Sequence, residues 1–172
     1  KSDKGIVTDG SSSTLIEWKD QSGNDRHVAN STSNNRPSVV SDSINANPAV
    51  FFDGTGQYLV DEDAEGYLDG LEEVTLITLV KSEEINSDSG FITTMNPDDN
   101  DDYFGIRFDT AGANGGQDDV IKPAISGTAN KQALESSANA QTTDWLPITL
   151  QWQRNTNLEM YLNFILDTPS HL

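Results

Sequence analysis

The stretch "WKDQSGN", residues 18–24, places a large aromatic side chain directly before a run of polar turn formers. Asp20, Ser22 and Asn24 carry side chains that fold back onto nearby backbone N–H groups, and Gly23 permits a positive φ. We therefore expect a strand to end at the tryptophan and the chain to turn outward after it. Three side-chain oxygens spaced two residues apart would also suit a cation or a sugar, so the stretch by itself leaves a scaffold role and a binding role open.

Short β-branched or aromatic runs, separated by turn residues, recur along the chain. They are TLIEW (14–18), AVFF (49–52), YLV (58–60), VTLITLV (74–80), GFITT (90–94), YFGIRF (103–108), DVIKPAI (119–125), ITLQWQ (148–153) and LEMYLNFIL (158–166). Because no regular alternation of strands with helices accompanies them, they predict an antiparallel sandwich or jelly roll. Residues 62–73 have room for one helical turn before Gly70. Residues 129–141 fit a short helix or a polar strand and loop equally well.

Two of these runs also indicate which way their side chains face. VTLITLV is apolar at both odd and even positions, which predicts a central strand buried on both sides. ITLQWQ alternates instead, with Ile148, Leu150 and Trp152 on one face and polar residues on the other. The second run therefore predicts a strand with one face in the core.

The composition restricts the classes of partner. The 172-residue chain suits one domain, and its 10 Lys and Arg against 28 Asp and Glu give a formal net charge of −18. Such a surface repels phosphate backbones, so we expect no nucleic-acid partner. The chain has no Cys, which excludes disulfides and thiolate ligands. Without an apolar run near the ~20 residues of a membrane span, we expect no direct membrane insertion.

Three motifs follow one another in a fixed order: W-x-D-x-S-G-N, then R-P, then P-A-V-x-F-D-G followed by Y-L. Their residues are Trp18, Asp20, Ser22, Gly23, Asn24, Arg36, Pro37, Pro48, Ala49, Val50, Phe52, Asp53, Gly54, Tyr58 and Leu59. In this order they resemble the LamG-like, concanavalin A-like jelly-roll domains of bacterial secreted and cell-surface proteins. The resemblance implies an all-β fold, an antiparallel two-sheet jelly-roll β-sandwich. It also implies a non-catalytic module for binding or adhesion that recognises carbohydrate or another surface ligand.

Two positions depart from the pattern of that family. Ala46 stands where Gly is usual, and Phe164 follows Asn163 where an Asn-Gly hairpin is expected. A two-residue type I′ turn needs a positive φ at both central positions, which Phe tolerates poorly, so we expect another hairpin geometry or an altered closing turn. We expect a single domain over residues 1–172, cut from a larger multidomain protein and lacking one or two terminal strands, with neighbouring domains of the same polypeptide among its partners.

Glycoside hydrolysis is the alternative from another functional class, since some concanavalin A-like folds are glucanases. Their carboxylates occupy alternate positions of a strand and so share one face. The nearest match here is DEDAE, with Asp61, Asp63 and Glu65. Glu62 and Ala64 give the opposite face no sizeable apolar side chain, and Gly66 interrupts the stretch. This composition favours a solvated acidic loop over a catalytic strand.

Metal binding is the chemistry that the acidic loops favour most. The stretch NPDDNDDYFGIRFD sets oxygen ligands at positions 1, 3, 5 and 12 of a loop, namely Asp98, Asn100, Asp102 and Asp109. Tyr103 replaces the glycine that an EF-hand needs for its sharp turn, and residues 103–109 read as a strand. We therefore expect no EF-hand, but either a Ca²⁺ cofactor held by a few of these oxygens or a simple solvated turn.

Recognition of a glycan requires an aromatic platform with hydrogen-bonding groups beside it. Trp145, preceded by Asp144 in a polar loop, is the candidate platform, and the alternative is that its ring caps the core. Asn114, in the oxygen-rich loop GANGGQDD (112–119), is a further candidate ligand-binding residue. The sequence thus predicts a secreted or bacterial cell-surface module whose partner is a glycan or another cell-surface ligand.

The early turns are assigned a structural role. Asp53 and Gly54 are expected to form a turn. Arg36 is expected to pair with a buried carboxylate such as Asp20 or Asp53, and the alternative is that it binds a ligand. A third interpretation of the whole chain is a purely structural surface or exported-filament module without a small ligand.

Overall fold

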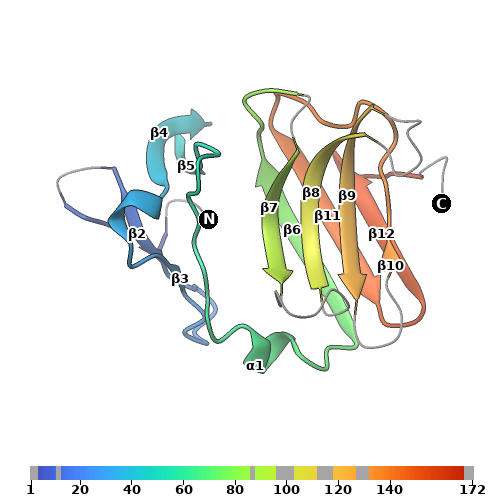
Figure 1. Ribbon diagram of the computed structural model, residues 1–172, viewed down its shortest axis with the longest axis horizontal. Helices are drawn as coiled ribbons and strands as arrows, with labels where there is room; N and C mark the ends of the chain where they lie inside the picture. The colour runs from blue at the N-terminus through green and yellow to red at the C-terminus, as the bar shows by residue number, and fades with distance from the viewer. Residues whose placement is uncertain are drawn as a thin grey trace. The chain divides into compact units, whose positions relative to one another are not determined.

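Antiparallel β-structure makes up about half of the described chain. The computed structural model describes residues 4–10, 13–85, 88–95, 103–111, 118–126 and 132–168, and it is shown in Figure 1. The chain divides into two compact units, Lys1–Gly70 and Leu71–Leu172. Every strand pairing among the described residues is antiparallel. The prediction of an all-β, antiparallel protein is confirmed.

The second unit contains two four-stranded sheets. One has the strand order β10-β9-β8-β7 and the other the order β13-β12-β11-β6. Figure 1 shows β7, β8 and β9 lying in front of β6, β11 and β12. The strands are β6 (Glu73–Val80), β7 (Ser89–Met95), β8 (Tyr103–Ala111), β9 (Asp118–Ser126), β10 (Gln132–Ala133), β11 (Leu146–Gln153), β12 (Asn157–Leu162) and β13 (Ile165–Leu166).

The two sheets are held face to face by one apolar cluster. Alternate residues of each strand point the same way, and the inward set is apolar. One sheet supplies Ile106, Phe108 and Ile121, and the other supplies Leu146, Ile148, Leu150 and Met160. At the rim of this core the half-buried Trp152 donates from Nε1 to Gln132 Oε1 at 2.6 Å, which links β11 to β10 across the sandwich. The predicted inward face of ITLQWQ is confirmed.

Strand β6 differs from the expectation for VTLITLV. It is an edge strand of its sheet, hydrogen-bonded to β11. Leu76 and Val80 pack against the core, whereas Ile77 is 71% exposed and Leu79 45% exposed. The prediction of a strand buried on both faces is wrong, because the apolar cluster covers one face of this sheet and not the other.

Residues 132–141, for which the sequence fits a short helix or a strand and loop equally well, form strand β10 and a loop. After β10, the backbone N–H of Leu134 donates to Pro123 O and that of Ser136 to Ile121 O, so the chain continues along the edge of β9. Described residues 132–141 therefore follow the strand-and-loop alternative. The single helical turn expected before Gly70 is present as α1 (Glu65–Leu68).

The first unit contains a three-stranded sheet and a hairpin. The sheet has the order β1-β2-β3, and the hairpin pairs β4 with β5. A short 3₁₀ helix, η1 (Ser33–Asn35), lies between them in the sequence. The predicted strand YLV is reduced to an isolated bridge between Val60 and Ala29. The strands are β1 (Ile6–Thr8), β2 (Leu15–Trp18), β3 (Val28–Ala29), β4 (Ser38–Ile44) and β5 (Asn47–Phe51).

Strand β2 ends at Trp18, as the opening stretch predicts, and the polar run after it forms a turn around one carboxylate. Asp20 accepts hydrogen bonds from the backbone N–H groups of Ser22 (2.8 Å), Asn24 (3.2 Å) and Arg26 (3.3 Å), and from the Ser22 hydroxyl at 2.6 Å. Gly23 adopts a φ of 89°. Because these hydrogen bonds, the two from Ser22 above all, stabilise the ionised form, they lower the pKa of Asp20 to about 2. The side-chain oxygens of Asp20 and Ser22 thus accept hydrogen bonds within their own turn.

Acid should weaken this turn. The folded-state pKa of Asp20 lies below its ordinary value of 3.8, so the carboxylate stabilises the fold above that value and loses its contribution as the pH falls from about 4 to about 2. We expect Asp20→Asn to lower the melting temperature at pH 7 and to match the parent near pH 2, as followed by circular dichroism. A difference in melting temperature between the two proteins that stays constant across this pH range would contradict the stabilising role of the Asp20 carboxylate.

Arg36 has different partners from those expected. Its Nε donates to Asn30 O at 2.6 Å, and Nη2 donates to Ser31 O at 2.9 Å. The prediction that Arg36 pairs with Asp20 or Asp53 is wrong. The reason is local: each of these carboxylates caps its own turn, while the chain around η1 brings backbone carbonyls within reach of the guanidinium.

The other predicted turn residues adopt their expected role. Asp53 Oδ1 accepts from the Thr55 backbone N–H at 2.8 Å and from its hydroxyl at 2.7 Å, and these bonds lower the pKa of Asp53. Gly54 has a φ of 74°. Pro37 is buried, and its carbonyl accepts from the N–H of Leu15 at 2.8 Å. These motif residues therefore shape the backbone of the first unit.

Two hairpin turns place non-glycine residues in the left-handed region. Asn45 and Ala46 have φ values of 47° and 59° between the paired residues of β4 and β5. Asn163 and Phe164 have values of 52° and 66° between Leu162 and Ile165. These are the signs expected of type I′ turns. The closing hairpin thus keeps the two-residue geometry in spite of Phe164, whose side chain is 77% exposed.

Glycine should relieve both turns. The left-handed conformation costs an L-residue roughly 1–2 kcal/mol. Glycine avoids this cost, but its greater conformational entropy in the unfolded chain offsets about half of the gain in stability. We expect Ala46→Gly and Phe164→Gly each to raise the free energy of unfolding by about 0.5–1 kcal/mol in urea titrations. The control Thr156→Gly, at a turn position outside the left-handed region, should lower it. A loss of stability in both turn variants would show that Ala46 and Phe164 are not strained by their positive φ angles.

Candidate ligand-binding site

A surface hollow of about 510 Å³ lies beside the start of β11 in the second unit. Two segments form it: the loop that leads into β11, and the end of β12 with the turn after it. Its polar and aromatic lining residues are Asn139, Thr142, Asp144, Trp145 and Asn163. Ala140, Leu146 and Leu162 supply apolar surface. The hollow therefore combines an aromatic ring, aliphatic surface and hydrogen-bonding groups.

The loop that carries Trp145 is tied to β9 and to the loop after β6. The buried Gln141 donates from its backbone N–H to Asp119 O at 2.9 Å, and from Nε2 to Glu84 O at 3.2 Å. The hydroxyl oxygen of Thr142 accepts from the N–H of Asp144 at 3.1 Å, which closes a local turn. These bonds hold the loop in a defined path into β11. Ligand binding therefore costs little conformational entropy for ordering this loop.

The opposite wall is set by the register of two strands. Ile148 of β11 pairs with Leu162 of β12, and the backbone N–H of Asn163 donates to Pro147 O at 3.0 Å. This pairing brings Asn163 next to the start of β11, and hence next to Trp145. The strand after the turn is held in place because Asp167 accepts from the N–H and the hydroxyl of Ser137, at 3.0 and 2.8 Å.

The hollow suits a ligand with both apolar and hydroxyl surface. Trp145 is half-buried and lines the hollow, while Asp144 is exposed. An indole offers a flat apolar face, and the amides, the hydroxyl and the carboxylate offer donors and acceptors around it. Of the residues expected from the sequence to bind a ligand, Trp145 and Asp144 come together here. Asn114 lies outside the described residues.

Three lining residues were missed by sequence reasoning. Asn163 was noted for its turn, and Asn139 and Thr142 belong to a segment without a motif. The polar composition near Trp145 was a signal for Thr142. For Asn163 the signal would have been the pairing of β11 with β12, which joins residues distant in sequence.

The acidic stretch of the alternative hydrolase hypothesis does not form a strand. Residues 62–64 form a turn and Glu65 begins α1, so strand alternation does not align the acids. Asp61 accepts from the Tyr67 hydroxyl at 2.8 Å and from the N–H of Asp63 at 3.0 Å. Burial raises the pKa of Tyr67, and the hydrogen bond to Asp61 raises it further.

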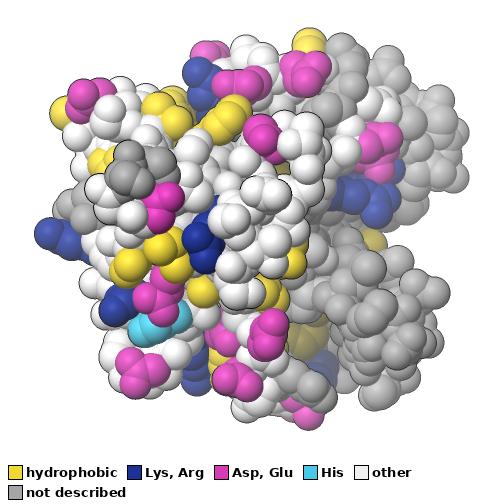
Figure 2. All heavy atoms as spheres, turned by 60° about the vertical axis from the view of Figure 1, so that its left-hand side comes forward, with side chains coloured by type: hydrophobic (Ala, Val, Ile, Leu, Met, Phe, Trp, Pro, Cys, Tyr) yellow, Lys and Arg dark blue, Asp and Glu magenta, His cyan; other side chains and the backbone are white. Residues whose placement is uncertain are grey.

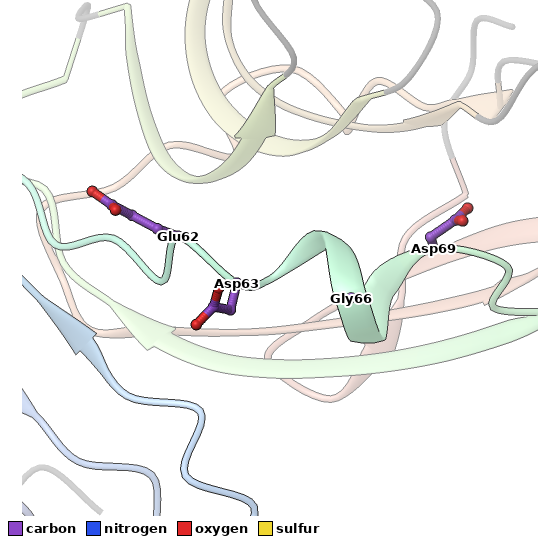
Figure 3. Close-up of a pocket in the computed structure, with 4 residues that line it drawn as sticks. All are labelled: Glu62, Asp63, Gly66 and Asp69. Atoms are coloured by element: carbon purple, nitrogen blue, oxygen red, sulfur yellow. The ribbon is translucent and has the colours of Figure 1, made fainter.

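A second hollow of about 490 Å³ lies next to this turn, lined by Glu62, Asp63, Gly66 and Asp69. Figure 3 shows that its three carboxylates point in different directions. Paired catalytic carboxylates flank the same bond, so this arrangement resembles a solvated acidic loop.

The predicted calcium ligands lie mostly outside the described residues. Asp98, Asn100 and Asp102 belong to that part of the chain. Asp109 lies inside β8, where its Oδ2 pairs with Arg107 Nη2 and Lys122 Nζ, both at 3.0 Å. Two cations already neutralise this carboxylate, so Asp109 is a member of an ion-pair row on the sheet. Within the described ranges, no group of three or more His, Cys, Asp or Glu side chains is arranged to hold a metal ion.

The described helical segments are too short to span a lipid bilayer. Comparisons of this chain with models of known protein families, with curated proteins and with solved structures found no match.

Proposed function

We propose that the chain is a non-catalytic extracellular module that binds carbohydrate, or another ligand of a cell surface, through the hollow at Trp145. The observation that carries the proposal is the lining of this hollow. It brings one indole, two amides, a hydroxyl and a carboxylate around apolar surface at an end of the sandwich. Sugar rings present C–H faces that stack on aromatic rings, and hydroxyls that exchange hydrogen bonds with such groups.

A jelly roll of LamG-like type is the fold that we propose for the chain. Two observations support it: the face-to-face antiparallel sheets of the second unit, and the turn motifs at Asp20 and Asp53 in the first unit. In this proposal the chain is one domain of a larger secreted or bacterial surface protein. Calcium bound by Asp98, Asn100 and Asp102 would stabilise the module or take part in binding its ligand.

A glycan array probed with the whole chain tests the function, once with Ca²⁺ and once with EGTA. We expect specific binding to a related set of glycans. Weaker binding in EGTA would support the calcium proposal, and unchanged binding would contradict it. A blank array under both conditions, from a protein whose circular dichroism spectrum shows folded β-structure, would overturn the proposal of carbohydrate recognition.

A further inference from the structure

We propose that the hollow at Trp145 selects glycans without negative charge and discriminates against sialylated or sulfated counterparts of the same glycans. This inference rests on the proposed function and adds the class of ligand. The reason lies in the charges of the lining. Of the described residues that line the hollow, Asp144 carries the ionisable side chain, and none is a Lys, Arg or His.

The surroundings of the hollow add negative charge. The loop after β6, residues 81–88, is joined to the Trp145 loop through Gln141. Its charged residues are one cation, Lys81, and three acids, Glu83, Glu84 and Asp88, so its formal charge is −2. The wall formed after β12 ends with Asp167. Near the hollow, acids thus outnumber the basic residue of the adjoining loop.

The charge of the whole chain acts in the same direction. The formal net charge is −18, and Figure 2 shows Asp and Glu side chains spread over the visible face instead of gathered in one patch. An anionic glycan therefore meets repulsion on approach, which lowers its association rate at low salt. Once in the hollow, its carboxylate or sulfate would lie close to Asp144, with no cation among the described lining residues to pair with it.

Asp144 also has a constructive role toward neutral sugars. An ionised carboxylate accepts up to four hydrogen bonds, and bonds from hydroxyl groups to a charged acceptor are stronger than those between neutral groups. Asp144 is exposed, and its backbone N–H donates to the Thr142 hydroxyl oxygen at 3.1 Å, so the backbone that carries the carboxylate is held at the hollow. The same side chain thus favours hydroxyl donors and repels anions.

Matched glycan pairs test this inference. The probes are the neutral glycans bound on the array and the same glycans bearing a terminal sialic acid or a sulfate ester, titrated by calorimetry in about 20 mM salt. We expect the parent to bind each neutral glycan about tenfold more tightly than its anionic counterpart. We expect Asp144→Asn to reduce this ratio at least threefold, and about 0.5 M salt to reduce it for the parent.

The control variant is Glu73→Gln, which removes one negative charge from an exposed residue of the second unit that pairs with Gln153, at the end of β11 away from Trp145. It should leave the neutral-to-anionic ratio unchanged. Equal or tighter binding of the anionic glycans by the parent would overturn the selectivity while leaving carbohydrate recognition in place. An unchanged ratio in Asp144→Asn would overturn the role of Asp144. Absence of binding to every glycan would instead be the failure of the proposed function.

Discussion

Replacing Ile148 by Ala is expected to lower the free energy of unfolding by about 2–5 kcal/mol, the largest effect on stability that we predict. Ile148 is fully buried in the middle of β11, in the cluster that joins the two sheets of the second unit. Truncation removes apolar contact and leaves a cavity, because core residues on both sheets limit how far the site can collapse. Urea titrations followed by circular dichroism and by tryptophan fluorescence measure the loss.

Gln151→Ala is the matched control for this variant. Gln151 lies on the same strand, is exposed and points away from the cluster. A substitution at such a position usually changes stability by no more than about 0.5 kcal/mol. If Ile148→Ala were as mild as Gln151→Ala, the face-to-face packing of the sheets through β11 would be contradicted.

Replacing Trp145 by Ala is expected to weaken glycan binding about tenfold to hundredfold, the largest effect on affinity that we predict. The indole is the largest apolar surface among the residues that line the hollow. Aromatic anchors in such positions commonly supply much of the binding energy. Calorimetric titration with the glycans bound on the array gives the change in Kd, and circular dichroism reports whether the sandwich remains folded.

Two conservative variants separate stacking from folding. Trp145→Phe keeps an aromatic face and should retain more affinity than the Ala variant. Trp152→Phe removes the hydrogen bond to Gln132 and should lower stability while leaving the affinity unchanged. An unchanged Kd in a folded Trp145→Ala protein would show that the ligand binds elsewhere.

Features set by neighbours in the sequence were predicted well. The alternation of Ile148 and Leu150 identified the inward face of β11, because side chains of a strand alternate regardless of what packs against them. The turn at Asp20 could also be predicted, since the hydrogen bonds that its carboxylate accepts come from residues at most six positions away. Asp144 and Trp145 line the same hollow, as expected for residues that are consecutive in the sequence.

Features set by distant residues were not predictable in this way. Periodicity shows that β6 is apolar on both faces, but the exposure of Ile77 depends on where the strand lies in its sheet. Arg36 was assigned a carboxylate by charge, whereas the path of the chain gave it carbonyl oxygens. Asn163 reaches the hollow through the register of β12 with β11, and no pattern within either strand encodes that register.

The most direct test of carbohydrate recognition at this hollow is a titration of ¹⁵N-labelled protein with a neutral glycan bound on the array, followed through the indole N–H signals. The chain has three tryptophans, and single Trp→Phe variants assign their signals. We predict that the Trp145 signal shifts progressively with glycan concentration, while those of Trp18 and Trp152 stay in place. Shifts at Trp18 or Trp152 with a stationary Trp145 would contradict the account.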